Sequence, residues 1–224
     1  RRPEAELERL RAHRTAELRK YQNAGYAARY AMFVDHVVEA EQRATGTTRL
    51  ATAVARYLYK LMAYKDEYEV ARLYSDGEFL RSIAERFEGD WSLRLYLAPP
   101  LFARKDDKGQ LIKQPYGART LKAFRILAAL RGLRGTWLDP FGRTAERRAE
   151  RALIEEYFQT IERLLPNLNP RTLDAAVRVA SVPEEIRGYG HVKEASMQKA
   201  AALRAQALEE FETARRDPVD SVAA

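Results

Sequence analysis

Acidic side chains crowd one apolar run of the sequence, KLMAYKDEYEVARLY (60–74), where buried acid chemistry could occur. If this run is helical, Asp66 falls near Met62 and Val70 on an apolar face. A carboxylate in such surroundings is costly unless it is paired or hydrogen-bonded. Its own helix offers no basic neighbour there, so we expect a buried charge that pairs with a residue from elsewhere, best an arginine. Catalysis by a buried acid is the alternative.

Neighbouring charged residues belong to the same candidate. Lys65 and Arg72 lie four residues before and three residues after Glu69, which are spacings at which side chains on a helix meet. Glu69 is therefore matched locally. The buried-charge candidate consists of Asp66, Lys65 and Glu69, and we assign no catalytic residue in the chain.

A second group of residues could bind an anion. The run RGYGHVKE (187–194) places two glycines ahead of an expected helix start, where backbone N–H groups can face an anion and basic side chains add charge. The candidate residues are Arg187, Gly188, Gly190, His191 and Lys193. The run is not a dinucleotide-binding fingerprint, because the third glycine and a preceding parallel strand are missing. An ordinary turn between two helices is the alternative.

The composition excludes several kinds of chemistry within this segment. The sequence has no cysteine, which rules out disulfides, thiolate nucleophiles and cysteine-ligated metal clusters. The three histidines, His13, His36 and His191, are scattered and form no metal-binding pair. No standard motif of a serine hydrolase, a phosphate-binding loop or a calcium loop occurs. We therefore expect no cofactor and no metal in this segment.

Basic residues outnumber acidic ones by 39 to 32, which gives a net charge of +7. Such a balance favours acidic partners, among them nucleic acid. Basic and aromatic residues are interleaved over 99–122, as in some nucleic-acid-binding ribbons, but Asp106 and Asp107 interrupt the pattern. Nucleic acid is therefore disfavoured, and a basic surface or a protein-docking arm is the simpler interpretation.

Apolar residues recur at intervals of three and four along most of the sequence, which predicts a mainly α, multi-helix fold. The first forty-odd residues are expected to be helical, and a long helix closes the fold over 191–215. The helix predicted over 48–74 is apolar on two sides and should run through the middle of the domain. Because it carries Asp66, the fold must bring the partner of Asp66 to this helix.

In one region the apolar residues no longer recur at helical intervals. From 91 to 97 apolar residues alternate with more polar ones, which is typical of a half-buried strand, and Asp107-Lys108-Gly109 supplies a turn. We expect one small antiparallel β-hairpin or three-stranded ribbon near residues 91–114. No linker composition is visible, so residues 1–216 are expected to be a single helical domain, with 217–224 as a flexible tail.

The sequence contains no targeting or membrane segment. No apolar run approaches the roughly 18 residues that a membrane helix requires, and the first residues have no apolar signal core. We therefore expect no membrane partner and a cytoplasmic location. The sequence begins with Arg1 rather than methionine, and we expect it to be a piece of a longer protein.

Four runs of the sequence resemble the C-terminal region of the long, fused bacterial indolepyruvate ferredoxin oxidoreductases, and they occur in the same order. They are YLYKLMAYKDEYEVARLYSDGEF (57–79), FEGDWSLRLYLAPPLFARKD (87–106), LRGTWLDPFGRTAERRAERALIEEY (133–157) and LPNLNPRTLDAAVRVASVPEEIRGYGHVKE (165–194). The resemblance covers most of the chain and is weaker over the first fifty and the last thirty residues. It implies a parent enzyme of the 2-oxoacid:ferredoxin oxidoreductase class.

The resemblance also implies what the parent does. Such enzymes use thiamine diphosphate to decarboxylate an aryl pyruvate, pass electrons through iron–sulfur clusters to ferredoxin, and give the acyl-CoA. This chain has neither the thiamine diphosphate motif GDG…N nor a cysteine for a cluster. We therefore expect a non-catalytic accessory domain that packs on the catalytic modules of the same polypeptide or builds a homodimer, with ferredoxin reached through the parent.

Two other functions remain open at this point. The chain could be an anion-, CoA- or ferredoxin-binding module of the same enzyme, with Arg187, His191 and Lys193 holding the anionic group. A basic nucleic-acid-binding domain is the more distant alternative.

Overall fold

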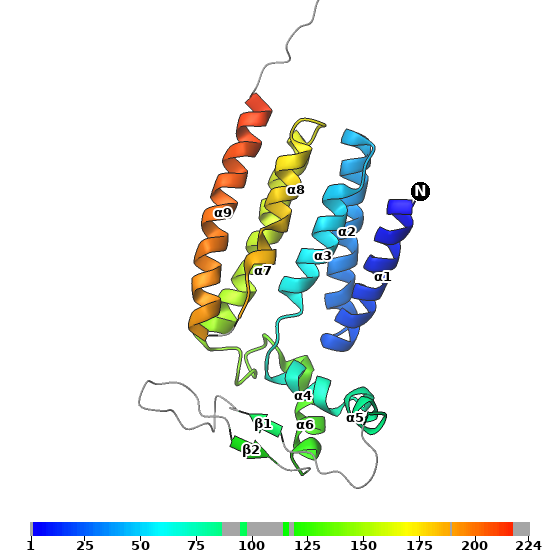
Figure 1. The fold of residues 1–224 in the computed structure, drawn as a ribbon, viewed down its shortest axis with the longest axis vertical. Helices are drawn as coiled ribbons and strands as arrows, with labels where there is room; N and C mark the ends of the chain where they lie inside the picture. Colours follow the sequence, from blue (N-terminus) through cyan, green and yellow to red (C-terminus); the bar gives the residue numbers. More distant parts are fainter. Residues whose placement is uncertain (1, 87–94, 98–113, 117–118, 189, 217–224) are drawn as a thin grey trace, which may run out of the picture. The chain divides into compact units, whose positions relative to one another are not determined.

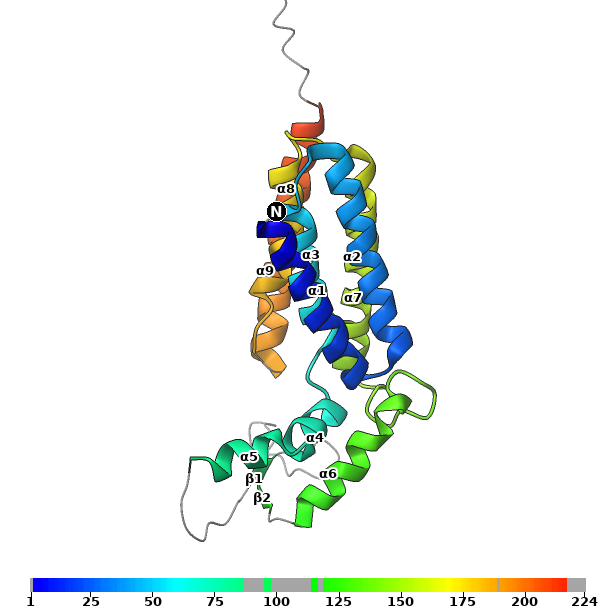
Figure 2. The same ribbon diagram turned by 90° about the vertical axis from the view of Figure 1, so that its right-hand side faces the viewer.

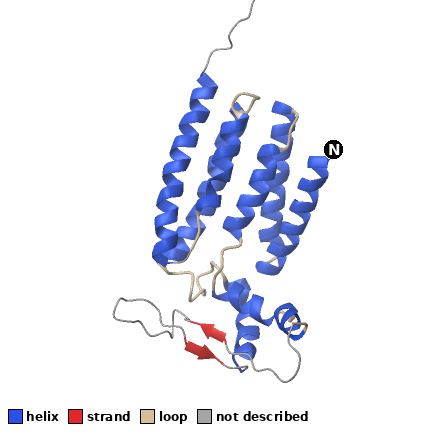
Figure 3. Cartoon of the chain, in the orientation of Figure 1, coloured by secondary structure: helices blue, strands red, loops and turns tan. Residues whose placement is uncertain are grey.

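The fold is known from a computed structural model that describes residues 2–86, 95–97, 114–116, 119–188 and 190–216. The described chain is mainly helical, which confirms the fold class predicted from the apolar periodicity (Figure 3). The predicted tail, 217–224, lies outside the described residues.

Two compact units make up the chain. Residues 1–63 and 144–224 form one, here called the bundle unit, and residues 64–143 form the other, called the insert unit because it interrupts the first in sequence. The sequence predicts a single domain over 1–216, and this range contains the described residues of both units. The first boundary falls inside the helix predicted over 48–74, at the point where that helix is broken.

The bundle unit is built from six α-helices and two 3-10 helices among the described residues (Figure 1). They are α1 (Arg2–Tyr21), α2 (Ala24–Thr45), α3 (Arg49–Met62), α7 (Ala145–Leu164), η2 (Leu165–Asn167), α8 (Leu173–Ser181), η3 (Val182–Glu185) and α9 (Gly190–Arg216). The helical start of the chain is thus two helices, because Asn23 accepts a hydrogen bond from the backbone N–H of Tyr26 (2.9 Å) and caps α2.

Helix α3 lies at the centre of the bundle unit and contacts α1, α2, α7 and α8. Its buried residues come from more than one side of the helix: Leu50, Ala51, Ala53, Val54, Ala55, Leu58, Leu61 and Met62. The prediction of a central helix that is apolar on two sides is therefore confirmed for residues 49–62. Figure 2 shows α2 beside α7, where the rings of Phe33 and Phe158 meet edge to face at 4.6 Å.

A buried acid from α2 caps the start of α3. Glu41 is fully buried, and its carboxylate accepts hydrogen bonds from the backbone N–H groups of Leu50 (3.0 Å) and Ala51 (2.8 Å). The hydroxyl of Thr47 donates a third hydrogen bond, at 2.7 Å. A carboxylate suits this place because the first N–H groups of a helix lack partners within the helix and carry partial positive charge.

The prediction that the helix continues to residue 74 is wrong. Helix α3 ends at Met62, and α4 begins at Glu67. Between them Asp66 has an extended backbone (φ −94°, ψ −176°), and its side chain accepts a hydrogen bond from the backbone N–H of Glu69 at 2.8 Å. An aspartate is a favourable helix cap and a poor interior residue, so this position starts a new helix instead of extending the old one.

The insert unit contains α4 (Glu67–Ser75), α5 (Glu78–Ala84), β1 (Leu95–Leu97), β2 (Gln114–Tyr116), α6 (Arg119–Ala129) and the 3-10 helix η1 (Leu130–Leu133). Helix α4 packs against α6 and α5. The two short strands pair antiparallel, with Leu95 opposite Tyr116. They fall at the region predicted as a hairpin or ribbon near 91–114, whose residues 91–94 and 98–113 lie outside the described residues, so the third strand stays a prediction.

Candidate functional site

Asp66, the acid singled out from the sequence, has the arginine partner that its apolar surroundings predict. Its side chain is 3% exposed, and that of Arg134 is also 3% exposed. Nε of Arg134 donates to Oδ2 of Asp66, and Nη2 donates to Oδ1 at 2.9 Å. Arg134 follows η1 and comes from outside the helix of Asp66, so this prediction is confirmed. The fork-shaped guanidinium matches the two carboxylate oxygens, which makes the pair geometrically specific.

A second buried acid lies in the same unit. Asp139 accepts hydrogen bonds from the backbone N–H groups of Gly135 (2.8 Å) and Phe141 (3.0 Å) and from the hydroxyl of Tyr68 (3.1 Å). The guanidinium of Arg134 lies 5.5 Å from the centre of the Tyr68 ring. Tyr68 thus contacts both Asp139 and Arg134, the partner of Asp66. We call Asp66, Tyr68, Arg134 and Asp139 the insert cluster.

The ionisation of the insert cluster follows from its contacts. Burial and the Asp139 carboxylate raise the pKa of Tyr68, so the phenol keeps the proton that it donates. Burial alone would raise the pKa of Asp139, but hydrogen bonds from backbone N–H groups and from Tyr68 outweigh it and lower the pKa below 3.8. Asp139 is therefore a stable carboxylate at neutral pH, with its oxygens already occupied, and is poorly suited to exchange protons with a substrate.

Glu69 is also buried, and Arg72 is its partner. Nε and Nη2 of Arg72 donate to the two carboxylate oxygens of Glu69, each at 2.8 Å. The local match expected for Glu69 is confirmed for this residue. Lys65 lies exposed in the segment between α3 and α4, one residue before the cap. The break at that point removes the four-residue helical spacing on which a Lys65–Glu69 pair depends.

The loop after η1 exposes large apolar side chains that sequence analysis did not select. The side chains of Trp137 and Leu138 are 79% and 53% exposed. Their backbone is held in place, since Nη2 of Arg143 donates to the Trp137 carbonyl (2.7 Å) and Asp139 binds both ends of the turn. A signal was present in GLRGTWLDPFGRT, where a tryptophan sits in a turn-forming loop. An exposed tryptophan on a fixed loop is a common anchor in protein interfaces.

The anion-binding candidate at 187–193 has its main groups engaged within the bundle unit. Nζ of Lys193 donates to the buried carboxylate of Glu150, which Arg147 also contacts. The backbone N–H of Arg187 donates to Oγ of Ser196 at 3.0 Å. These contacts fix the turn into α9, the alternative weighed for this run, and they draw Lys193 away from an anion.

The glycines of that run have a conformational role. Gly188 has a φ of 88°, and a Cβ added there would lie only 2.6 Å from Cγ1 of Val192. Gly190 is the first residue of α9, and His191 follows it in the helix. The side chain of His191 lies outside the described residues. The structure accounts for Gly188 as a turn residue without an anion.

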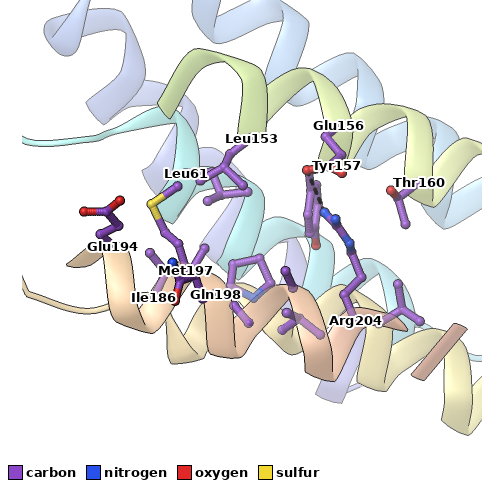
Figure 4. A pocket seen from close by; sticks show the side chains of 15 residues that line it. Leu61, Leu153, Glu156, Tyr157, Thr160, Ile186, Glu194, Met197, Gln198 and Arg204 are labelled. Atoms are coloured by element: carbon purple, nitrogen blue, oxygen red, sulfur yellow. Dashed lines mark ion pairs between the residues drawn. The ribbon is translucent and has the colours of Figure 1, made fainter. Parts of the chain in front are cut away.

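A pocket of about 340 Å³ lies in the bundle unit, with walls from α3, α7, α8, η3 and α9 (Figure 4). Its surface is mainly apolar, with Leu61, Leu153 and Met197 among the residues that face it. At one end Arg204 of α9 reaches Glu156 of α7 in an ion pair of 2.6 Å. Sequence analysis did not find this pocket, because its walls come from five separate segments.

The described residues contain neither a cluster of metal ligands nor a helix that could span a membrane. No group of three or more His, Asp or Glu side chains in that part of the chain is placed to hold a metal ion. Among the described helices, none combines the length and the apolar character needed to cross a membrane.

Comparison with known proteins gives one match. Residues 7–206 match the family model described as a family of unknown function (DUF6537). No curated protein and no solved structure matches the chain.

Proposed function

We propose that this chain, which belongs to the DUF6537 family, is a non-catalytic accessory domain of a cytoplasmic indolepyruvate:ferredoxin oxidoreductase. In this proposal the parent enzyme oxidatively decarboxylates aryl pyruvates to acyl-CoA, with ferredoxin as the electron acceptor. The accessory domain packs on the catalytic modules of the same polypeptide and supports their assembly. The four sequence runs that resemble the C-terminal region of such enzymes, in the same order along the chain, support the choice of parent.

The state of the buried acids is the observation that carries the non-catalytic role. Five carboxylates are buried in the described chain: Glu41, Asp66, Glu69, Asp139 and Glu150. Each accepts hydrogen bonds or ion pairs from its own unit: Glu41 and Asp66 cap helices, Asp66, Glu69 and Glu150 pair with basic side chains, and Asp139 binds loop N–H groups and the Tyr68 hydroxyl. A general acid or base must face the reacting group and exchange its proton. Acids engaged in this way stabilise the fold instead.

The residue types of the chain support a proposal in which the cofactors of the parent enzyme lie in its other modules. An iron–sulfur cluster needs cysteine thiolates, and this chain has no cysteine. The thiamine diphosphate motif is missing from the sequence as well. Thiamine diphosphate and the clusters therefore belong to the catalytic modules in this proposal, and ferredoxin is reached through the parent.

The loop of Trp137 and Leu138 supports an interaction role. The segment 119–143, which includes this loop, has six basic residues and one acidic residue, Asp139. Apolar anchors in a segment whose basic residues outnumber its acidic ones fit an acidic protein surface with an apolar centre.

Two measurements test the proposal. Purified alone and supplied with indolepyruvate, thiamine diphosphate, CoA and ferredoxin, the chain should show no turnover, and turnover by the chain alone would contradict the non-catalytic role. For the second measurement, this domain and the catalytic modules of the full-length enzyme are produced as two separate polypeptides. Trp137→Ala in the domain should weaken their association by about tenfold or more.

The matched control for Trp137 is Met32→Ala, which removes a side chain that is 71% exposed in the bundle unit. This variant should associate as the wild type does. Equal association of the two variants would show that the Trp137 loop is not the docking surface. A chain that forms homodimers dependent on Trp137, and does not bind the catalytic modules, would assign the loop to a second copy instead.

A further inference from the structure

We propose that the pocket between α7, α8 and α9 binds a small molecule that has an apolar body and a carboxylate. This site lies in the bundle unit and is independent of the accessory role proposed above, which concerns the insert unit and the protein partners. None of the buried ion pairs described above lines this pocket. They therefore do not explain why the bundle unit contains an open space here.

The size and the walls of the pocket define the apolar body of the ligand. A volume of about 340 Å³ is at the lower end of the range for small-molecule sites and is too small for a folded protein element. Most of the surface is supplied by aliphatic side chains, with Leu61, Leu153 and Ile186 from three different segments. Met197 adds a flexible thioether that can adapt to the shape of a ligand.

The walls are held in place by hydrogen bonds that do not depend on a ligand. The hydroxyl of Tyr157 donates to the carbonyl of Ala180 in α8 at 2.8 Å, which fixes the ring at the pocket wall. Nζ of Lys60 donates to the carbonyls of Pro183 and Glu184, at 2.8 and 2.9 Å, and fixes η3. A preformed pocket loses little conformational freedom when a ligand enters.

Arg204 provides the group that would recognise a carboxylate. Its guanidinium pairs with Glu156 across the end of the pocket, and both side chains are partly exposed to solvent. Exposed ion pairs contribute little free energy, since water solvates each partner well when they separate. A ligand carboxylate can therefore replace Glu156 on the guanidinium while Glu156 turns to solvent.

The second acid of the pocket sets the orientation of the ligand. Figure 4 shows Glu194 at the end opposite Arg204, so a carboxylate on the ligand is repelled from one end and attracted to the other. The apolar body then lies along Leu61, Leu153 and Met197 between them. This arrangement selects an amphiphilic anion over a neutral apolar molecule of the same shape.

Octanoate is the probe for the test, and octanamide is its uncharged match. Binding to the full chain is measured by calorimetry and by backbone NMR shifts at α7 and α9. Octanoate should bind with one site, and octanamide should bind about fivefold more weakly, because the neutral amide cannot form an ion pair with Arg204. 2-Naphthoate, tested in the same way, distinguishes an aromatic body from an alkyl body.

Three variants locate the site. Arg204→Gln should weaken octanoate binding about fivefold and remove the preference over octanamide. Ala201→Phe, which fills the pocket from α9, should abolish the binding of both. Arg178→Gln in α8 is the matched control. It also breaks an ion pair with α9, because Arg178 pairs with Glu210 at 2.8 Å, but Arg178 does not line the pocket. It should bind as the wild type does.

The outcomes are decisive in both directions once thermal unfolding shows that each variant is folded. Loss of the carboxylate preference in Arg204→Gln alone supports the proposal. Equal binding by the Arg204 and Arg178 variants, binding that survives Ala201→Phe, or no binding of either carboxylate by the wild type would overturn it. Because no catalytic module or docking loop enters these measurements, their failure would leave the accessory role untouched.

Discussion

In the bundle unit the buried charges lie at the ends and edges of an apolar core, whereas in the insert unit charged residues form much of the buried interior. Among the described residues, the bundle unit buries thirty apolar side chains and two charged ones, Glu41 and Glu150. The described part of the insert unit buries four apolar side chains and four charged ones. Apolar burial should therefore dominate the stability of the first unit, and ion pairs and hydrogen bonds that of the second.

This difference bears on function. An apolar core tolerates a pocket, because its remaining contacts hold the fold, and the bundle unit contains the one for which we propose a ligand. The insert cluster instead fixes a short loop in a single geometry, since its hydrogen bonds are directional. Such a loop is suited to present Trp137 and Leu138 to a partner. The comparison can be tested by perturbing each unit separately.

The largest effect is expected from Arg134→Met, which leaves Asp66 buried without its partner. Loss of one member of a buried ion pair is expected to destabilise the insert unit by about 3–5 kcal/mol. Hydrogen exchange should increase in α4 and α6, while the bundle unit keeps its protection. Both tryptophans, Trp91 and Trp137, belong to the insert unit, so fluorescence during denaturant unfolding reports on this unit alone.

Two comparisons sharpen that measurement. Arg49→Met removes an exposed pair with Asp174 in the bundle unit and should cost only about 0–1 kcal/mol. Combining Asp66→Asn with Arg134→Met should recover part of the lost stability, because the uncompensated charge is then gone. If Arg134→Met and Arg49→Met proved equally mild, polar contacts would not dominate the insert unit.

A somewhat smaller loss is expected from Met62→Ala in α3. Met62 is fully buried, so its truncation leaves a cavity and should destabilise the bundle unit by about 2–5 kcal/mol. Exchange protection should fall in α1, α2 and α8 and remain in α4 and α6. Met32→Ala, at an exposed position of the same unit, should stay within about 0.5 kcal/mol of the wild type. Equal losses in both units would show that they unfold together.

How far the sequence predicts these features depends on how many positions separate the interacting residues along the chain. The need of Asp66 for a basic partner follows from its immediate neighbours, which the helical spacing reveals. The identity of Arg134 does not, because the two residues are 68 positions apart and only the fold joins them. For Lys193 the same limit led to a candidate anion ligand. Its partner Glu150 lies 43 positions away, so the sequence around Lys193 does not reveal that its charge is already paired.

The break between α3 and α4 had a local signal that the apolar pattern concealed. Asp66 stands three residues before Glu69, the spacing of a helix cap and the N–H group that it binds. Tyr64 and Tyr68 nevertheless continued the apolar stripe of α3. Periodicity assumes that a helix continues, and here capping decided where it stopped. The pocket depends on tertiary packing, so no local pattern marks it, whereas the Trp137 loop had a local signal in its turn-forming residues.

The smallest effect we expect is a loss of stability in acid that is greater for the insert unit. The pKa of Asp139 is lower in the folded protein than the ordinary 3.8, so its contribution is present above pH 3.8 and is lost as the pH falls through the folded pKa. Tryptophan fluorescence during urea unfolding, repeated from neutral pH to below 3.8, should show this loss in the wild type, and Asp139→Asn should reduce it. In the bundle unit the pKa of Glu155 is also lowered, by its hydrogen bond with Arg29, but this pair is exposed and its contribution is screened by water. An acid response that is unchanged by Asp139→Asn would mean that a different carboxylate controls it.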